Sequence, residues 1–179
     1  MSPLLSRPTN APELTALLRD ADHVDVRTAQ SAASLPEFVA GLLGWQPWYV
    51  KGLFGARAVL ARLLRLERPD VPLGAPVTAD AVSVEPGTRI GFFTVVEGAE
   101  DRYLTMAAAD NHLTAYLVVV VDPAVGFGVG ERRRFQVVTV VKHHRWTGPV
   151  YFAIIRPFHH LVVACMVGHA APAGAVRAL

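Results

Sequence analysis

The fold is decided around the stretch LTAYLVVVV, residues 113–121, in which β-branched and aliphatic side chains predominate. Such side chains are restricted at χ1 and pack well on a pleated surface, so the stretch predicts a strand. Three further segments predict strands, at residues 90–96, 103–108 and 135–142. Turn-forming residues or glycine separate the segments, including DNH at 110–112. Four consecutive strands with such connections predict an antiparallel meander.

A long helix is predicted to follow the meander. Thr147 has the side chain of a helix N-cap, and Pro149 is tolerated in a first turn. Pro157 removes one backbone hydrogen bond within the helix, so we expect a kink there. Two adjacent apolar stripes form a wide face, which is typical of a helix lying across a sheet. The first holds Tyr151, Ile154, Phe158, Leu161 and Cys165, and the second holds Phe152, Ile155, His159, Val162 and Met166.

The same segment, residues 149–168, is about as long as a transmembrane helix. Its centre carries Arg156, Pro157, His159 and His160. An arginine at the middle of a bilayer costs roughly 3 kcal/mol even on a lenient insertion scale. We therefore expect no membrane span, and interpret the segment as a helix buried in the protein core.

The residues before the meander predict shorter elements. Residues 1–20 are expected to form a loose arm with a short helical turn, and residues 23–26 a first strand. Ser34 can cap a helix that has Pro36 and Glu37 in its first turn. Apolar residues at helical spacing predict a second helix over 48–66, and the proline-rich connection 69–86 has an edge strand near 81–84. We divide the chain into the arm (1–20), a single domain (21–170) and a flexible tail (171–179).

The composition is that of a folded domain. Of 179 residues, 52% are hydrophobic and 18% are charged, which excludes a disordered chain. Seventeen basic residues against fifteen acidic ones give a net charge of +2. Nucleic-acid-binding proteins concentrate basic residues on one face, so we expect no nucleic-acid partner. Cys165 is the single cysteine, so no disulfide can form within the chain, and a cytoplasmic location is expected.

Four short stretches, in their order, resemble a known family. They are ADHVD at 21–25, WYVKGL at 48–53 with Arg57, DNHL at 110–113 and PFHHLV at 157–162. The family is an uncharacterised bacterial domain family of the START and birch-pollen-allergen superfamily (SRPBCC), found alone or fused behind a short-chain-dehydrogenase-like domain. The resemblance implies an α+β helix-grip fold, in which a curved antiparallel sheet wraps around a long C-terminal helix with a ligand cavity between them. It implies no particular reaction, substrate or catalytic residue.

The leading functional hypothesis is the binding of an apolar or amphipathic small molecule, such as a lipid, polyketide or aromatic compound. Binding cavities are mostly apolar with a few polar anchors, and the alanines at 107–109 and 115 would leave room for one. No cofactor is expected. The candidate lining residues are Phe92, Thr94, Met106, Tyr116, Phe135, Thr139, Ile155 and His159.

Two other functions stay open from the sequence. A cyclase-like or dehydratase-like enzyme would need an acid–base group in the same cavity. Its trial residues are His159 or His112, with Tyr116. A protein-interaction or homodimerisation module would instead use exposed aromatic side chains. Its candidates are Trp48, Tyr49 and Trp146.

The remaining motifs favour ordinary structural roles. The histidine pairs 143–144 and 159–160 cannot chelate a metal alone, because neighbours face opposite sides of a strand and lie about 100° apart on a helix. No metal is expected, unless one histidine of each pair meets the other. His159 is interpreted either as a partly buried histidine bonded to a backbone carbonyl or as a ligand contact. The glycine run 126–130 lacks the third glycine of a dinucleotide fingerprint, and the arginine run 132–134 is interpreted as a solvated strand start.

Overall fold

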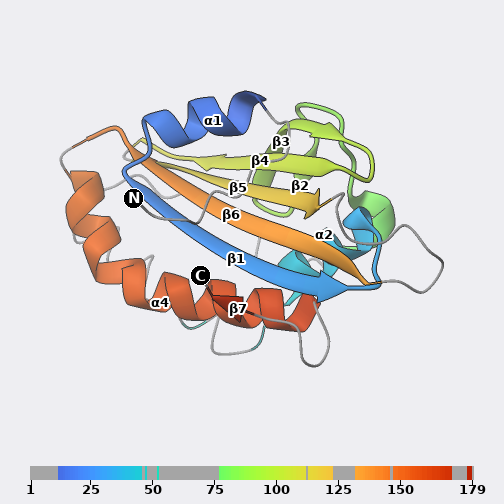
Figure 1. The fold of residues 1–179 in the computed structure, drawn as a ribbon. Helices are drawn as coiled ribbons and strands as arrows, with labels where there is room; N and C mark the ends of the chain where they lie inside the picture. Colours follow the sequence, from blue (N-terminus) through green and yellow to red (C-terminus); the bar gives the residue numbers. More distant parts are fainter. Residues whose placement is uncertain are drawn as a thin grey trace.

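A curved antiparallel sheet with helices on both faces makes up the described part of the chain (Figure 1). In the computed structural model, the described residues are 12–45, 47, 52, 77–111, 113–122, 132–145, 147–170 and 177–178. The strand order is β2-β3-β4-β5-β6-β1-β7. The strands are β1 (His23–Ser31), β2 (Arg89–Ile90), β3 (Phe93–Ala99), β4 (Tyr103–Ala109), β5 (Leu113–Asp122), β6 (Arg133–His143) and β7 (Arg177–Ala178). The helices are α1 (Pro12–Arg19), α2 (Leu35–Gly44), a 3-10 turn η1 (Ala79–Ala81) and α4 (Thr147–Ala170). The α+β class, with a curved antiparallel sheet and a long C-terminal helix, is confirmed.

The predicted meander is confirmed in β3, β4, β5 and β6, which pair in sequence order. The strand expected at 90–96 is interrupted, because Gly91 adopts a positive φ of 62° and turns the chain between β2 and β3. The prediction of an edge strand near 81–84 is wrong. Its first residue ends the 3-10 turn η1, and residues 82–84 have no strand assignment.

Strand β1 is longer than expected, with nine residues instead of four. It pairs with β6 along its whole length, from His23 opposite Val141 to Ser31 opposite Arg133. This pairing brings the N-terminal part of the chain beside the last strand of the meander.

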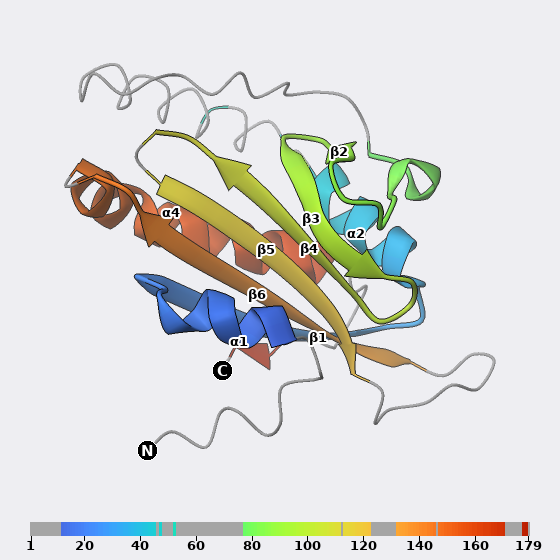
Figure 2. The same ribbon diagram turned by 90° about the horizontal axis from the view of Figure 1, so that it is seen from above.

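The two faces of the sheet are covered by different helices. Figure 2 shows α1 in front of the strands and α2 and α4 behind them. On the α1 face, Leu14 packs against Val118, Val120, Val138 and Val140. From Pro12 onward, the segment expected as a loose arm is therefore a helix packed on the sheet.

Helix α2 begins as predicted, at the Ser34 cap. The Ser34 side chain accepts a bond from the Glu37 backbone N–H, and the Glu37 carboxylate accepts one from the Ser34 N–H at 2.7 Å. This reciprocal capping satisfies two backbone donors that the helix itself leaves free. The helix then presents Phe38, whose ring stacks on Phe135 of β6 with 4.1 Å between ring centroids.

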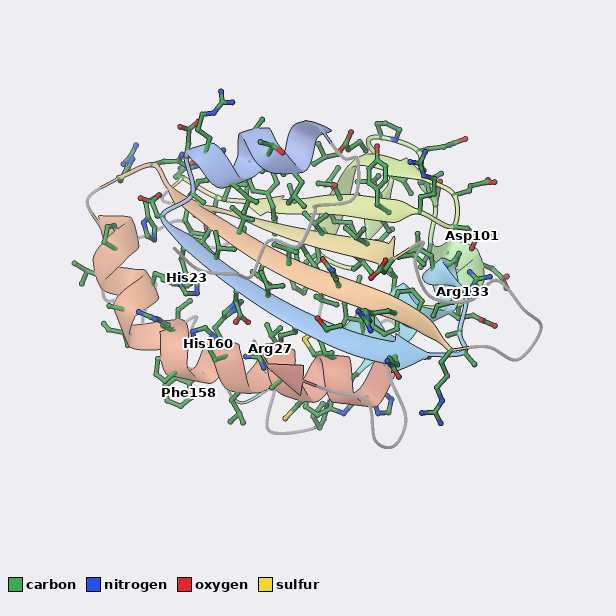
Figure 3. All side chains as sticks on the ribbon, in the orientation of Figure 1. His23, Arg27, Asp101, Arg133, Phe158 and His160 are labelled. Carbon is green, nitrogen blue, oxygen red and sulfur yellow. The ribbon has the colours of Figure 1, made fainter. Side chains whose placement is uncertain are left out.

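Helix α4 spans the predicted residues but is not the buried core helix that was expected. Its buried hydrophobic side chains are Phe152, Val163, Val167 and Ala170. Ile154, Phe158 and Leu161 are each about half exposed, at 48%, 51% and 56%, and Phe158 points away from the sheet in Figure 3. The second predicted stripe thus faces the sheet, and Ile154, Phe158 and Leu161 of the first stripe face outward.

By length and composition alone, Phe152–Ala170 could cross a membrane, and 11% of that window is buried. The burial is low because, within the described residues, α4 packs mainly against α2, β1 and β6, which leaves its outer side uncovered. The predicted helix at 48–66 (apart from Gly52), the glycine run 126–130 and the tail at 171–176 lie outside the described residues.

Candidate functional site

The polar side of β1 points towards α4. In β1, His23, Asp25 and Arg27 alternate with two valines, and each lies opposite an inward-facing residue of β6. Val24 lies on the other face and is 39% exposed. Val26 on that face packs against the apolar cluster under α1, so β1 turns its valines towards α1 and these polar residues towards α4. Arg27, only 8% exposed, is among the buried polar residues.

Phe152 of α4 is surrounded by three imidazole rings. Its ring centroid lies 4.9 Å from that of His23, 5.8 Å from that of His143 and 6.0 Å from that of His159. These rings come from β1, β6 and α4. Figure 3 shows His23 and His160 in the space between β1 and α4. We call the group of His23, Thr139, His143, Phe152 and His159 the histidine site.

Four buried polar atoms of the histidine site have no hydrogen-bond partner. They are His23 Nε2, Thr139 Oγ1, His143 Nε2 and His159 Nε2, and they are the only such side-chain atoms among the described residues. An unsatisfied buried polar group costs about 1–3 kcal/mol, and native proteins contain few of them. Their gathering on one patch is therefore a feature that needs an explanation.

A charged network joins β1 to α4 beside this patch. Arg27 Nε donates to Asp25 Oδ2 at 3.0 Å, and Arg27 Nη2 donates to the His160 carbonyl at 3.2 Å. His160 Nδ1 lies 3.6 Å from the same carboxylate oxygen. Arg156 Nε donates to His160 Nε2 at 3.4 Å. His160 thus has contacts on both ring nitrogens, unlike its neighbours in the histidine site.

Burial keeps two of the histidines neutral. Desolvation lowers the pKa of His159 to about 4, and the nearby His160 adds to the effect. The pKa of His23 is also lowered, first by burial and then by Arg156. Asp25 opposes both shifts with its negative charge. At neutral pH these two rings are therefore neutral, each offering one donor and one acceptor nitrogen.

Of the two ring nitrogens of His143, Nδ1 lies near a carboxylate and Nε2 has no partner. Asp22 Oδ2 accepts the His143 backbone N–H at 2.6 Å and lies 3.4 Å from His143 Nδ1. On the opposite face, His144 Nε2 shares a 2.7 Å hydrogen bond with Thr114 Oγ1. The adjacent histidines therefore have different environments, as the strand alternation predicted.

Three of the eight predicted lining residues lie where α4 meets the sheet, two in α4 and one in β6. Thr139 and His159 belong to the histidine site, and Ile155 packs partly buried against the cluster around Phe152. Met106 and Phe135 are fully buried in the main core, where Phe92 also packs. Their side chains fill space instead of bordering a site.

The remaining two predicted lining residues are corrected by the strand register. Thr94 pairs with Ala107, Ala107 with Tyr116, and Tyr116 with Val140. Val140 packs under α1. Because directly opposed residues point to the same face, Thr94 and Tyr116 lie on the α1 face and cannot line a space under α4.

The structure also bears on the predictions for His159, for a metal site and for the arginine run 132–134. The backbone-carbonyl partner expected for His159 is not found for Nε2, which is unpaired. One histidine of each adjacent pair does approach Phe152, yet among the described residues no three His, Cys, Asp or Glu side chains could hold a metal. Arg133 pairs with Asp101 at 3.0 Å (Figure 3), and Arg134 pairs with Asp122 at 3.8 Å.

Most of the residues proposed for the other two functions lie outside the part of the chain that the structure describes. His112, Trp48, Tyr49 and Trp146 lie outside the described residues. Sequence reasoning missed His23. The signal that could have found it is the alternation of His23, Asp25 and Arg27, which makes one side of the first part of the strand polar.

A known protein family matches the part of the chain that forms most of this fold. Residues 14–166 match the model of a family described as "Protein of unknown function (DUF2867)". The chain belongs to the DUF2867 family. The matched range begins in α1, includes the whole sheet except β7, and ends within α4, so it contains the histidine site. No curated protein and no solved structure matches the chain.

Proposed function

We propose that this DUF2867 domain binds a mainly apolar small molecule with a polar group, between the N-terminal half of α4 and strands β1 and β6. The observation that carries the proposal is the set of four unpaired polar atoms in the histidine site. A folded protein tolerates such a set when a partner completes it, because each unpaired atom otherwise reduces stability. The apolar side chains beside it, Phe152, Leu113 and Val141, suit the body of such a ligand.

The backbone of α4 supports access to this region. Pro157 has no N–H, so the carbonyl of Ala153 has no intrahelical partner, and the helix is weakened at that point. Beyond Pro157, Val163, Val167 and Ala170 anchor the helix in the main core. Before Pro157, Phe152 is the one large buried side chain among those that the structure describes. The N-terminal half can therefore move at a lower cost than the C-terminal half.

We also propose that the family belongs to the START and birch-pollen-allergen superfamily. Its support is the order of a first strand, an intervening helix, an antiparallel meander and a long C-terminal helix packed on one face of the sheet. A cytoplasmic location is part of the proposal, since the chain has a single, free cysteine. In this view the ligand lies where the superfamily places its ligands.

Binding can be tested without knowing the ligand. Native mass spectrometry of protein purified from expressing cells should show a mass above that of the chain. Spectra of the ¹⁵N-labelled imidazoles should then change for His23, His143 and His159 when the ligand is extracted. His144 is the internal control, because it is bonded to Thr114 on the opposite face. An unliganded mass, together with no response of the three rings to a library of apolar compounds, would reject the proposal.

One contact favours a second candidate function, an acid–base enzyme. Asp22 beside Nδ1 of His143, with Nε2 unpaired, is the arrangement in which a histidine accepts a proton from a substrate. His159 suits that role poorly because a pKa of about 4 makes it a weak base, and Tyr116 lies on the wrong face. Under this alternative, a captured ligand should change chemically with time in the wild type and remain unchanged in His143→Gln.

A further inference from the structure

The hydrogen-bonding character of His143 Nε2 follows from its neighbours. A neutral imidazole carries its proton on one nitrogen and a lone pair on the other. Asp22 Oδ2 is an acceptor at 3.4 Å from Nδ1, so the proton belongs on Nδ1. The same oxygen is held in place by the 2.6 Å bond from the His143 backbone. Nε2 is then an acceptor, buried and unpaired.

His160 provides a reference for this assignment within the same molecule. Its Nδ1 also faces an aspartate, Asp25, at 3.6 Å. Its Nε2 accepts a hydrogen bond from Arg156 Nε at 3.4 Å, as the assignment requires. Two aspartate–histidine pairs therefore share one arrangement. In one of them the lone pair is taken by an arginine of the protein, and in the other it is unused.

The surroundings of His143 decide which donor suits the unused lone pair. The His143 ring is 12% exposed and lies beside Phe152. Arg27 is bonded to Asp25 and to the His160 carbonyl, and Arg156 donates through its Nε to His160 Nε2. His23 and His159 are neutral at pH 7. A carboxylate and an ether both present only acceptor atoms to the Nε2 lone pair, so either group would leave Nε2 unpaired.

We propose that His143, oriented by Asp22, selects ligands whose polar group is a neutral hydrogen-bond donor, such as a hydroxyl or an N–H. The inference rests on the proposed binding function and names the chemistry that the site would recognise. The hydroxyl donates to Nε2 while the apolar body contacts Phe152. A buried acceptor discriminates strongly against a ligand that lacks the donor, because that ligand leaves the acceptor unsatisfied.

Three probes of one shape test the inference: 2-naphthol (a donor), 2-methoxynaphthalene (an acceptor only) and 2-naphthoate (an anion). Dissociation constants are measured by calorimetry at pH 7. For the wild type we expect 2-naphthol to bind about threefold to tenfold more tightly than 2-methoxynaphthalene, and 2-naphthoate to bind most weakly. His143→Phe should bind the first two equally. His144→Phe, the matched control, should keep the wild-type preference.

A measurement on the wild type avoids dependence on variants that fold poorly. The ¹⁵N shifts of the free protein report directly whether His143 Nε2 carries a proton. An unprotonated Nε2 that shifts on addition of 2-naphthol supports the inference, and a protonated one overturns it. Equal binding of 2-naphthol and 2-methoxynaphthalene overturns it while the binding function stands. Tighter binding of 2-naphthoate also overturns it, and so does the absence of binding by all three probes, whereas the binding function itself is judged by native mass spectrometry and the compound library.

Discussion

The face of the sheet that carries α2 and α4 has two unlike halves. Under α2 and the C-terminal half of α4, side chains such as Phe38, Phe135 and Leu104 are completely buried, and two of them stack. Under the N-terminal half of α4, a small apolar cluster around Phe152 is surrounded by histidines. All four buried side-chain polar atoms without a partner among the described residues lie in or next to this second half, since the His159 ring reaches Phe152 from just beyond Pro157. We call them the packed half and the histidine half.

The difference shows how one sheet can provide both stability and a site. Dispersion and burial are maximal where side chains interlock without polar groups. Polar groups that lack partners reduce stability, and they are retained where function requires them. The packed half therefore holds the sheet in place, so that the histidine half can remain unsatisfied without unfolding the domain.

The largest expected effect comes from removing an aromatic ring from each half. Phe135→Ala should lower the free energy of unfolding by about 3–5 kcal/mol, since a fully buried ring leaves a cavity that cannot collapse. Phe152→Ala should cost roughly half as much, because its ring neighbours are mainly imidazoles. Urea denaturation of both variants measures this. Equal losses would show that the N-terminal half of α4 belongs to the same core.

Acid should weaken the histidine half before the packed half. In the folded protein the pKa of His159 is about 4, against 6.5 for the unfolded chain. Between these values the unfolded state binds more protons, so stability is complete above pH 6.5 and falls as the pH drops towards 4. The loss from this one group is on the order of 3 kcal/mol.

The test is a series of urea midpoints from pH 8 to pH 4 for the wild type and for His159→Phe. The variant should show a shallower decline, because it has lost this group. His144→Phe, which removes an exposed histidine of the opposite face, should decline like the wild type. If the slope is the same in all three proteins, His159 is not the group that links stability to pH.

Much of the fold was predictable from the sequence, and the reason is periodicity. The run at 113–121 and its neighbours specify strands through β-branched side chains, and Ser34 with Glu37 specifies the start of α2 through a local capping pattern. The long helix from Thr147 follows from its spacing of apolar residues. All of these depend on residues close together in the chain, which is why they could be read from it.

The histidine site depends on contacts that no local pattern contains. His23 and His159 are 136 positions apart in the sequence, and they face the same ring only because β1 pairs with β6 and α4 crosses beneath both. At β1 the valines face the cluster under α1, and alternation alone does not show that the opposite, polar side meets α4. For Thr94 and Tyr116, the prediction of a strand was right, but the predicted face of the sheet was wrong. Alternation separates the two faces of a strand without showing which of them meets α4.

Two threonine-to-valine changes should move stability in opposite directions. Thr139 Oγ1 is buried without a partner, so Thr139→Val should raise the free energy of unfolding by about 1 kcal/mol. Thr114 Oγ1 bonds His144 at 2.7 Å, so Thr114→Val should lower it by about 1 kcal/mol. Thermal melts of the two isosteric variants decide the matter. A loss at Thr139 would mean that its hydroxyl has a partner in solution, and that the histidine half is better satisfied than proposed.

The smallest effect is expected on the outer side of α4, opposite the histidine half. Phe158 is half exposed and points away from the sheet (Figure 3), so Phe158→Ser should change the free energy of unfolding by less than about 0.5 kcal/mol. The same should hold for Leu161→Ser. For a single chain in solution, the urea midpoints should also be independent of protein concentration. A larger loss that grows with concentration would indicate that a second copy covers this stripe. In that case the N-terminal half of α4 would be held from both sides, and its freedom to admit a ligand would depend on dissociation of the pair.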